Sequence, residues 1–206
     1  MINGKTIAIT RSKDDAVGFT RLAKQNGATA IPLPTIELVS KGEKIVDEFL
    51  ESVETYNPDY SVFMSSKAVK LLFDVAKNVG KYESLQLAVA NTIVMSVGPK
   101  TTTALEKEGI KVNHQPTTFS SVGVGEEFTT LHAVGKKVII PRSGASNSFL
   151  KELLNKIGIN VVEIHLYDVC AFRDTTQWNG FRELFYQNKI DGVVFTSASS
   201  PSVQTG

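Results

Sequence analysis

The clearest signal of fold class is DYSVFMSSKAV, residues 59–69, in which an apolar run leads directly into small hydroxylic residues and a helical pattern. The run hardly alternates in polarity, which is typical of a strand buried on both faces of a parallel sheet. Apolar positions then recur with helical spacing over residues 67–79, and Gly80 follows as a C-cap glycine. This order predicts an α/β fold.

The same strand-then-helix pattern recurs along the chain. Other short apolar runs rich in β-branched residues lie at 5–9, 28–31, 92–96, 138–140, 160–164 and 192–195. Helical patterns begin near Asp14 and at 100 and 149, and each ends just before a glycine: Gly27, Gly109 and Gly158. The repetition predicts doubly wound α/β architecture with parallel sheets.

In the first helix, Val17, Leu22 and Ala23 are spaced to form one buried face. The loop at 120–125 contains two glycines and leads into a further helical pattern, so we interpret it as a flexible helix start.

Two extended segments interrupt the pattern and indicate two lobes. They lie at 32–39 and 165–172 and flank a block of about 130 residues, a normal domain size. If they run side by side, they form a two-strand connector between the lobes. The predicted boundaries are 1–36 plus 171–206 for a discontinuous lobe 1, 40–166 for lobe 2, and 36–40 and 166–171 for the connectors.

An internal repeat supports two similar lobes. DGVVFTSASS at 191–200 resembles the segment at 59–69, and both read as a buried strand that runs into a serine-rich helix start. The first copy continues through a further strand and helix, whereas the second stops at Gly206. We therefore expect a C-terminally incomplete lobe 1 with an open strand edge, where exposed apolar residues favour pairing or aggregation.

Composition excludes several classes of function. The 206 residues carry 22 Lys plus Arg against 21 Asp plus Glu, and a formal net charge of +1 provides no basic field for nucleic acid or an anionic membrane. One cysteine, Cys170, excludes an internal disulfide and a multi-thiolate metal site. The chain shows neither a signal-peptide pattern nor an apolar run of the ~20 residues that span a bilayer. We predict a cytoplasmic protein.

Candidate ligand-binding residues follow the predicted strands. In open parallel sheets ligands bind beyond the carboxyl ends of the strands, and helix N-termini there attract anions. The candidates are Thr10 and Arg11; Ser65, Ser66 and Lys67; Gly98, Lys100 and Thr101; Arg142 and Ser143; and Ser197. Simple helix capping explains any one of the hydroxyl groups. Five such strand ends, most of them with Arg or Lys, favour a ligand with several anionic groups.

Familiar catalytic motifs are missing from the sequence. There is no Walker loop, no dinucleotide fingerprint, no nucleophile elbow and no metal-ligand spacing among the three histidines. An NAD-type enzyme is therefore disfavoured. Tyr167 is the one titratable side chain that we single out in the predicted connectors, where an amphipathic packing role is the simpler interpretation.

Taken in order, these residues resemble the uroporphyrinogen-III synthase family. The carriers are 9–11, 32–34, 36–37, 63–69, 97–102, 140–142, 166–167 and 195–197. The resemblance implies two flavodoxin-like α/β lobes with parallel sheets, joined by a two-strand β-ladder. It also implies cyclisation of the linear tetrapyrrole hydroxymethylbilane, with loss of water and inversion of ring D, in a cleft between the lobes. No metal or organic cofactor, no nucleic acid and no membrane partner is implied, and we expect a monomer.

The resemblance also implies roles for single residues. Tyr167 matches the tyrosine favoured as the acid for the leaving group, and Ser65, Thr101 and Ser197 match hydroxyl groups that line the cleft. A second Gly-Pro-x-Thr loop, which the family carries in its first lobe, has no counterpart in this chain. The alternative is a non-catalytic, two-lobed module that binds a small anion or has a regulatory role. Turnover of hydroxymethylbilane distinguishes a synthase from such a module.

The substrate chemistry agrees with the residue types. Hydroxymethylbilane carries eight carboxylates, which suits helix N-termini together with Arg11, Lys67, Lys100 and Arg142. Its own pyrroles supply the nucleophile, so the enzyme must shape the chain and protonate a leaving group. We expect Arg142 to act mainly in binding, because a guanidinium that follows a strand can fork onto a carboxylate.

Overall fold

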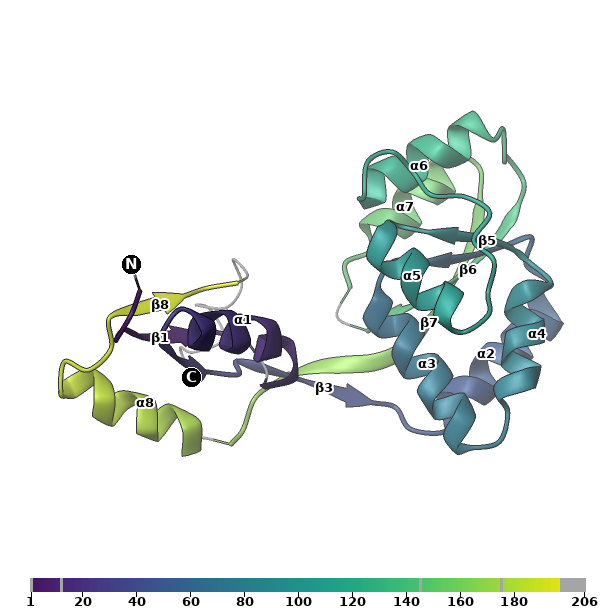
Figure 1. Cartoon of the computed structure of the whole chain (residues 1–206). Helices are drawn as coiled ribbons and strands as arrows, with labels where there is room; N and C mark the ends of the chain where they lie inside the picture. The colour runs from purple at the N-terminus through teal and green to yellow at the C-terminus, as the bar shows by residue number, and fades with distance from the viewer. Residues whose placement is uncertain (1, 12, 145, 175, 197–206) are drawn as a thin grey trace. The chain divides into compact units, whose positions relative to one another are not determined.

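The computed structural model describes residues 2–11, 13–144, 146–174 and 176–196 (Figure 1). The chain divides into two compact units, of which unit 1 comprises Met1–Val39 with Val169–Gly206 and unit 2 comprises Ser40–Asp168. The chain crosses between the units in β3 (Ile36–Ser40) and β7 (Asn160–Ala171), which are hydrogen-bonded neighbours.

These two strands run in opposite directions. The Lys41 amide donates to the Leu166 carbonyl at 3.2 Å, and the Phe172 amide donates to the Thr35 carbonyl at 3.1 Å. The runs predicted separately at 160–164 and 165–172 form one twelve-residue strand, β7. The fold is mixed α/β with parallel sheets, as predicted.

Unit 2 is built on the larger sheet, in the order β3-β7-β6-β4-β5. Strand β4 is parallel to β5 and to β6, and β6 is parallel to β7. Besides β3 and β7, the elements are α2 (Lys44–Tyr56), β4 (Tyr60–Phe63), α3 (Ser66–Asn78), α4 (Tyr82–Ala90), β5 (Ile93–Ser96), α5 (Pro99–Lys107), α6 (Ser121–Thr130), β6 (Lys137–Ser143) and α7 (Phe149–Lys156).

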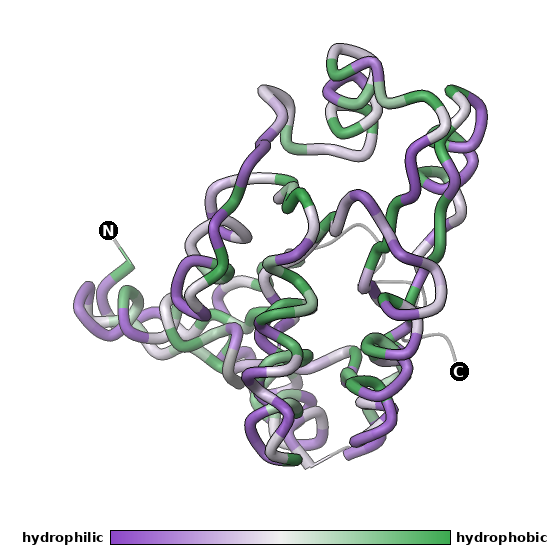
Figure 2. Tube along the Cα trace, turned by 90° about the vertical axis from the view of Figure 1, so that its right-hand side faces the viewer, coloured by the Kyte–Doolittle hydropathy of each residue, from purple (hydrophilic) through white to green (hydrophobic). Residues whose placement is uncertain are grey.

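Helices cover both faces of this sheet. Tyr60 and Val62 of β4 belong to a buried cluster with Phe128 of α6 and Leu150 of α7, and the rings of Tyr60 and Phe128 lie 5.1 Å apart. Because side chains alternate along a strand, Phe63 points to the opposite face, where α3 packs against β4. All four residues of β4 are buried, which explains why its sequence shows no polar alternation. Along the helices, hydrophilic and hydrophobic residues alternate (Figure 2).

Unit 1 carries a three-stranded sheet in the order β2-β1-β8, with all strands parallel. Its elements besides the crossing strands are β1 (Thr6–Ile9), α1 (Lys13–Gln25), β2 (Thr29–Pro32), α8 (Thr176–Tyr186) and β8 (Gly192–Val194). No residue of α8 is buried. In the described part of the chain β8 forms one edge of this sheet, and Val193, Val194 and Phe195 are exposed.

The face predicted for α1 is wrong for Val17 and Leu22 and right for Ala23. Val17 and Leu22 are 51% and 59% exposed, whereas Ala16 and Ala23 are buried. Helix α1 packs beside β2. Alanines allow a helix to approach a sheet closely, so the helix turns its small residues inward and its larger ones outward.

The glycine loop at 120–125 is well packed, contrary to the flexible start that we expected. The Ser120 hydroxyl caps α6 by accepting from the Gly123 amide at 3.2 Å. A Cβ at Gly123 would lie 1.9 Å from the Thr118 carbonyl oxygen, and one at Gly125 would lie 2.7 Å from a Leu153 methyl. Both glycines are buried and allow close approach of neighbouring atoms.

The internal repeat extends to matching contacts in the two units. Before β4, Asp59 accepts from the Lys136 ammonium at 2.8 Å and from the Lys137 amide at 2.9 Å. Before β8, Asp191 accepts in the same way from the Lys5 ammonium at 2.6 Å and the Thr6 amide at 2.7 Å. In each unit the aspartate therefore ties its strand to the start of the neighbouring parallel strand.

These hydrogen bonds, above all the one from Lys136, hold the pKa of Asp59 below its ordinary value. A carboxyl with a depressed folded-state pKa stabilises the fold above its unfolded pKa, near 4, and loses that contribution as the pH falls through the folded value. We therefore expect Asp59→Asn to cost about 1 kcal/mol at pH 7, with the difference from wild type shrinking below about pH 4. Urea unfolding at pH 7 and pH 3 measures both. A cost that does not change with pH would contradict the role of the charge.

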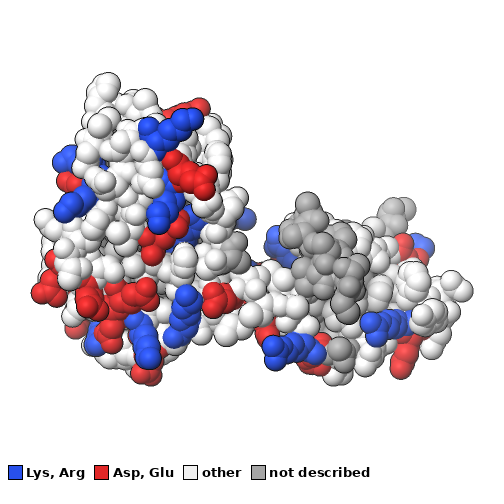
Figure 3. Space-filling view, turned by 180° about the vertical axis from the view of Figure 1, so that it is seen from behind, with Lys and Arg blue, Asp and Glu red and all other residues white. Residues whose placement is uncertain are grey.

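Acidic and basic side chains are intermixed over the face of unit 2 in Figure 3, in line with the balanced overall charge. Within the residues that the structure describes, no helix has the length and apolar character needed to cross a membrane.

Candidate functional site

The candidate site in unit 2 is the edge where the parallel strands β6, β4 and β5 end, with β7 beside β6. Because these strands are parallel neighbours, their carboxyl ends meet at one edge of the sheet. The structure thus brings together the predicted residues after β4 (Ser65, Ser66, Lys67), after β5 (Gly98, Lys100, Thr101), at the end of β6 (Arg142, Ser143) and in β7 (Tyr167). Strand order makes these residues neighbours.

After β4, Ser65 caps helix α3. Its hydroxyl accepts from the Lys67 amide at 3.1 Å and the Ala68 amide at 3.4 Å. The capping interpretation of Ser65 is therefore confirmed, and its hydroxyl is engaged within the chain. Ser66 is half-buried and Lys67 is exposed at the first turn of the helix. The positive end of α3 and an ammonium group thus face the same region.

After β5, helix α5 begins at Pro99 with Gly98 as its N-cap residue. A Cβ at Gly98 would lie 3.0 to 3.2 Å from ring atoms of Phe119, so glycine allows this ring to pack against the loop. Thr101, which the family resemblance places on a cleft, is only 3% exposed. Lys100 is exposed beside it. Gly98 is buried under Phe119, so Pro99 and Lys100 are the more accessible parts of this strand end.

At the end of β6, Arg142 forms an ion pair with Glu163 of β7. The two side chains are only 10% and 12% exposed, and the Arg142 Nε atom is buried with no hydrogen-bond partner in the described part of the chain. The charge of Arg142 is therefore already compensated inside the sheet.

A β-bulge lies beside this pair. Arg142 is opposite His165, whereas the next residue, Ser143, is opposite Tyr167, so Leu166 is an extra residue in β7. Leu166 and Tyr167 are consecutive and both buried, at 0% and 7% exposure. Regular alternation would place them on opposite faces, and a bulge is a common way to redirect a side chain next to an active site. No hydrogen bond to the Tyr167 hydroxyl is found among the described residues.

A groove of about 730 Å³ adjoins this edge between α3 and α5. Its basic lining residues are Lys67 and Lys70 from α3 and Lys100 and Lys107 from α5. Sequence reasoning found Lys67 and Lys100 but missed the other two. A signal was present, because Lys70 follows Lys67 by three residues and Lys107 follows Lys100 by seven, the spacing of one helix face.

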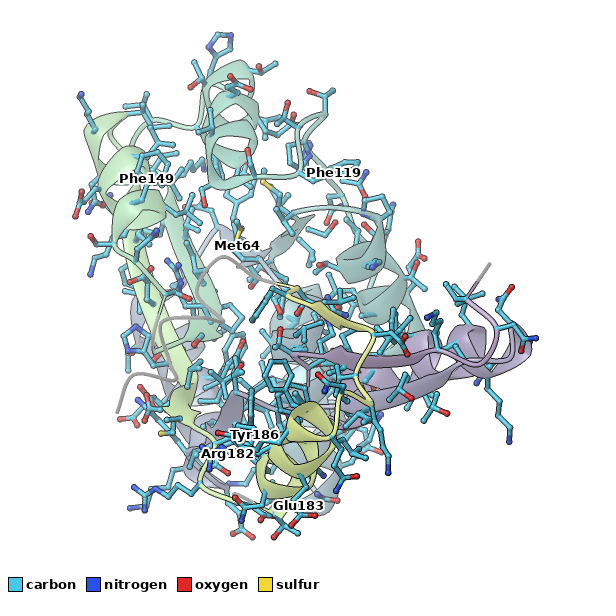
Figure 4. All side chains as sticks on the ribbon, turned by 90° about the vertical axis from the view of Figure 1, so that its left-hand side faces the viewer. Met64, Phe119, Phe149, Arg182, Glu183 and Tyr186 are labelled. Carbon is cyan, nitrogen blue, oxygen red and sulfur yellow. The ribbon has the colours of Figure 1, made fainter. Side chains whose placement is uncertain are left out.

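Apolar side chains also lie near these strand ends. Figure 4 labels three of them, Met64, Phe119 and Phe149. Met64 directly follows β4. Phe119 is 57% exposed although it packs against Gly98, and Phe149, the first residue of α7, is 47% exposed. Their signal in the sequence was a large apolar residue at the end of a loop, which is too common to be informative alone.

The remaining candidates lie in unit 1. Thr10 is 3% exposed, and its hydroxyl donates to the Val194 carbonyl and accepts from the Thr196 amide, both at 3.3 Å. Thr10 therefore fastens the segment that follows β8 within unit 1. Arg11 is exposed. Ser197 lies outside the described residues.

The described residues contain no group of three or more His, Cys, Asp or Glu side chains arranged to hold a metal ion. The functional groups that the edge does offer are helix N-termini, lysines, hydroxyls and a buried phenol.

Parallel sheets whose strand ends carry helix N-termini and lysines are typical of α/β proteins that bind small anionic ligands. Comparison with known proteins identifies the class more closely. The family model described as uroporphyrinogen-III synthase HemD matches residues 18–202. The chain belongs to the uroporphyrinogen-III synthase family.

Individual relatives agree with this assignment. A putative uroporphyrinogen-III synthase of Methanothermobacter thermautotrophicus is 25% identical over 93% of this chain and 73% of its own length. The uroporphyrinogen-III synthase of Chlorobaculum parvum is 24% identical over 95% of this chain and 76% of its own. A crystal structure of a mutant Thermus thermophilus uroporphyrinogen III synthase has a TM-score of 0.68 at 15% identity, covering 97% of this chain and 75% of that one, which shows a shared fold.

Proposed function

We propose that this chain is a uroporphyrinogen-III synthase that cyclises hydroxymethylbilane to uroporphyrinogen III, with inversion of ring D and loss of one water, in tetrapyrrole biosynthesis. Membership of the family over residues 18–202 carries the proposal. The residues at the carboxyl edge of the unit 2 sheet support it, because they are suited to an anionic substrate and to a reaction that needs no protein nucleophile.

The chemistry requires little covalent participation by the protein. The hydroxyl group on the bilane's hydroxymethyl carbon departs with a proton and leaves an electrophilic azafulvene. For ring D to invert, its α-carbon that already carries the bridge to ring C must attack the azafulvene first. The bond between that carbon and its old bridge then breaks, and the bridge carbon bonds to the free α-carbon of ring D, which gives up a proton. The overall change is loss of one water. The protein must fold the bilane so that its ends meet and must protonate the departing hydroxide.

Tyr167 is the proposed acid for this step. The bulge at Leu166 redirects its side chain, its ring is buried in the unit 2 sheet, and no described residue binds its hydroxyl. The phenol is thus held in place by packing of the ring while its O–H group has no partner in the described part of the chain. Both features suit a proton donor to a bound substrate.

The proposed substrate contacts are the strand ends described above. In unit 2, Lys67 and Lys100 supply charge for carboxylates, and the backbone of Ser65, Ser66 and Gly98 supplies amides at helix N-termini. Phe119 offers apolar surface to pyrrole rings.

Further contacts are proposed for Thr101, Arg142, Ser143 and, in unit 1, for Thr10, Arg11 and Ser197. For Arg142 to bind substrate, it must release Glu163 and pair with a substrate carboxylate instead. A cytoplasmic location and a monomeric state are likewise proposals, and the single cysteine supports the first of them.

The decisive experiment is incubation of the purified chain with hydroxymethylbilane, followed by oxidation and separation of the isomers. Spontaneous cyclisation gives isomer I, without inversion of ring D. We expect isomer III to dominate in the presence of the protein. Isomer I alone, formed at the rate without protein, would refute the proposal and favour the alternative of a non-catalytic anion-binding module.

A further inference from the structure

We propose that the groove between α3 and α5 binds carboxylate side arms of the tetrapyrrole, and that Lys70 and Lys107 determine how many of those arms are recognised. The inference rests on the proposed function, which it deepens by extending the substrate contacts beyond the strand ends.

The groove is formed by two helices that start at the same edge. Helices α3 and α5 follow the adjacent strands β4 and β5 and pack against each other. Lys67 and Lys70 are three residues apart on α3, and Lys100 and Lys107 are seven apart on α5, so each pair lies along one face of its helix. All four line the groove. The lysines therefore continue the anion-binding edge along the groove by one turn of α3 and two turns of α5.

The charge in the groove is not balanced from within. Its acidic lining residues are Asp74 and Glu108. Glu108 is bound by Lys77 at 2.7 Å, and this contact raises the pKa of Lys77, so the charge of Glu108 is already compensated. Lys70, Lys100 and Lys107 make no hydrogen bond or ion pair within the described part of the chain. The groove therefore has an excess of positive charge that suits an anionic ligand.

The size of the groove favours a small molecule over a single ion. Its volume of about 730 Å³ lies within the range of ligand pockets, roughly 300–1,000 Å³. Lysine is a flexible point charge that accepts carboxylates in many geometries. A bilane carries an acetate and a propionate on each of its four pyrroles, so several arms can reach lysines on two helices together. Recognition should then depend on the number of carboxylates.

The test compares two stable porphyrins, uroporphyrin I with eight carboxylates and coproporphyrin I with four. The variant is Lys70→Gln/Lys107→Gln, and the matched control is Lys44→Gln/Lys156→Gln, which removes two exposed lysines from α2 and α7 with the same change in charge. We expect the groove variant to weaken uroporphyrin I binding roughly tenfold, because two partly exposed ion pairs are lost. The affinity of the groove variant for coproporphyrin I should fall much less. The control variant should bind both porphyrins as wild type does.

Circular dichroism should show that both variants fold, since all four lysines are on helix surfaces. Unchanged uroporphyrin affinity in the groove variant, or an equal loss in the control variant, would overturn the inference. A parallel assay with hydroxymethylbilane separates this result from the proposed function. If wild type turns over hydroxymethylbilane and the groove variant has an unchanged KM, the groove inference is refuted and the synthase proposal stands. If uroporphyrin I binding depends on the lysines but no turnover occurs, the synthase proposal is refuted and the groove remains a polycarboxylate-binding site.

Discussion

Replacing Tyr167 by phenylalanine is expected to lower kcat for isomer III about a hundredfold while the protein stays folded. General acid assistance contributes about 10²–10⁴-fold, and the loss should lie at the low end because hydroxymethylbilane also cyclises spontaneously and water can replace the phenol. The phenylalanine ring keeps the packing of a residue that is 7% exposed, and no hydrogen bond of the described part is lost. Isomer-resolved kinetics and urea unfolding measure the two effects.

Tyr60→Phe is the matched control. Tyr60 is 6% exposed in the same sheet, but it begins β4 and so lies at the end of that strand remote from the carboxyl edge. We expect its kcat to equal that of wild type. Among the products of Tyr167→Phe, isomer I should form a larger share, because the spontaneous reaction then competes. An equal loss in both variants, or none in Tyr167→Phe, would contradict the assignment of the acid.

The helices that sequence reasoning found in unit 2 share one physical feature. Helices α3, α5 and α7 are followed by Gly80, Gly109 and Gly158, each with φ between +69° and +85°, the left-handed conformation that glycine adopts without strain. A glycine beyond the last turn is readable in the sequence. The strands were readable for a different reason, because a strand covered on both faces has no polar alternation.

Helices α2, α4 and α8 were missed because no glycine ends them. The chain leaves α2 at Asn57, with φ +48°, and α4 at Asn91, while α8 is followed by Asn188, with φ +54°. Asparagine tolerates the left-handed region because its short amide can bond locally, but it is as common in ordinary loops. The signal was present but ambiguous.

The arrangement of the site depended on information that local sequence does not hold. Which strand ends become neighbours is set by the order β7-β6-β4-β5, and this order results from the crossovers rather than from any one segment. The ion pair of Arg142 with Glu163 joins residues on two strands, and the bulge at Leu166 is a matter of register between the same strands. A pattern along one strand predicts which faces are buried, but not which residue is opposite which.

That ion pair supports the second large effect, a loss of about 3–5 kcal/mol in the free energy of unfolding on Glu163→Ala. Removing one partner of a buried pair leaves the other charge uncompensated, and here the Arg142 Nε atom already lacks a partner among the described residues. Urea unfolding at pH 7 measures the loss.

The double variant Arg142→Met/Glu163→Leu tests the cause. If the cost comes from an unpaired buried charge, removing both charges with apolar groups of similar size should restore most of the stability. If the stability losses of the two single substitutions simply add in the double variant, packing rather than charge is responsible. The restored protein also reports on binding: if Arg142 exchanges Glu163 for a substrate carboxylate, the double variant should bind uroporphyrin I more weakly than wild type. Unchanged affinity would confine Arg142 to holding β6 against β7 beside the bulge that directs Tyr167.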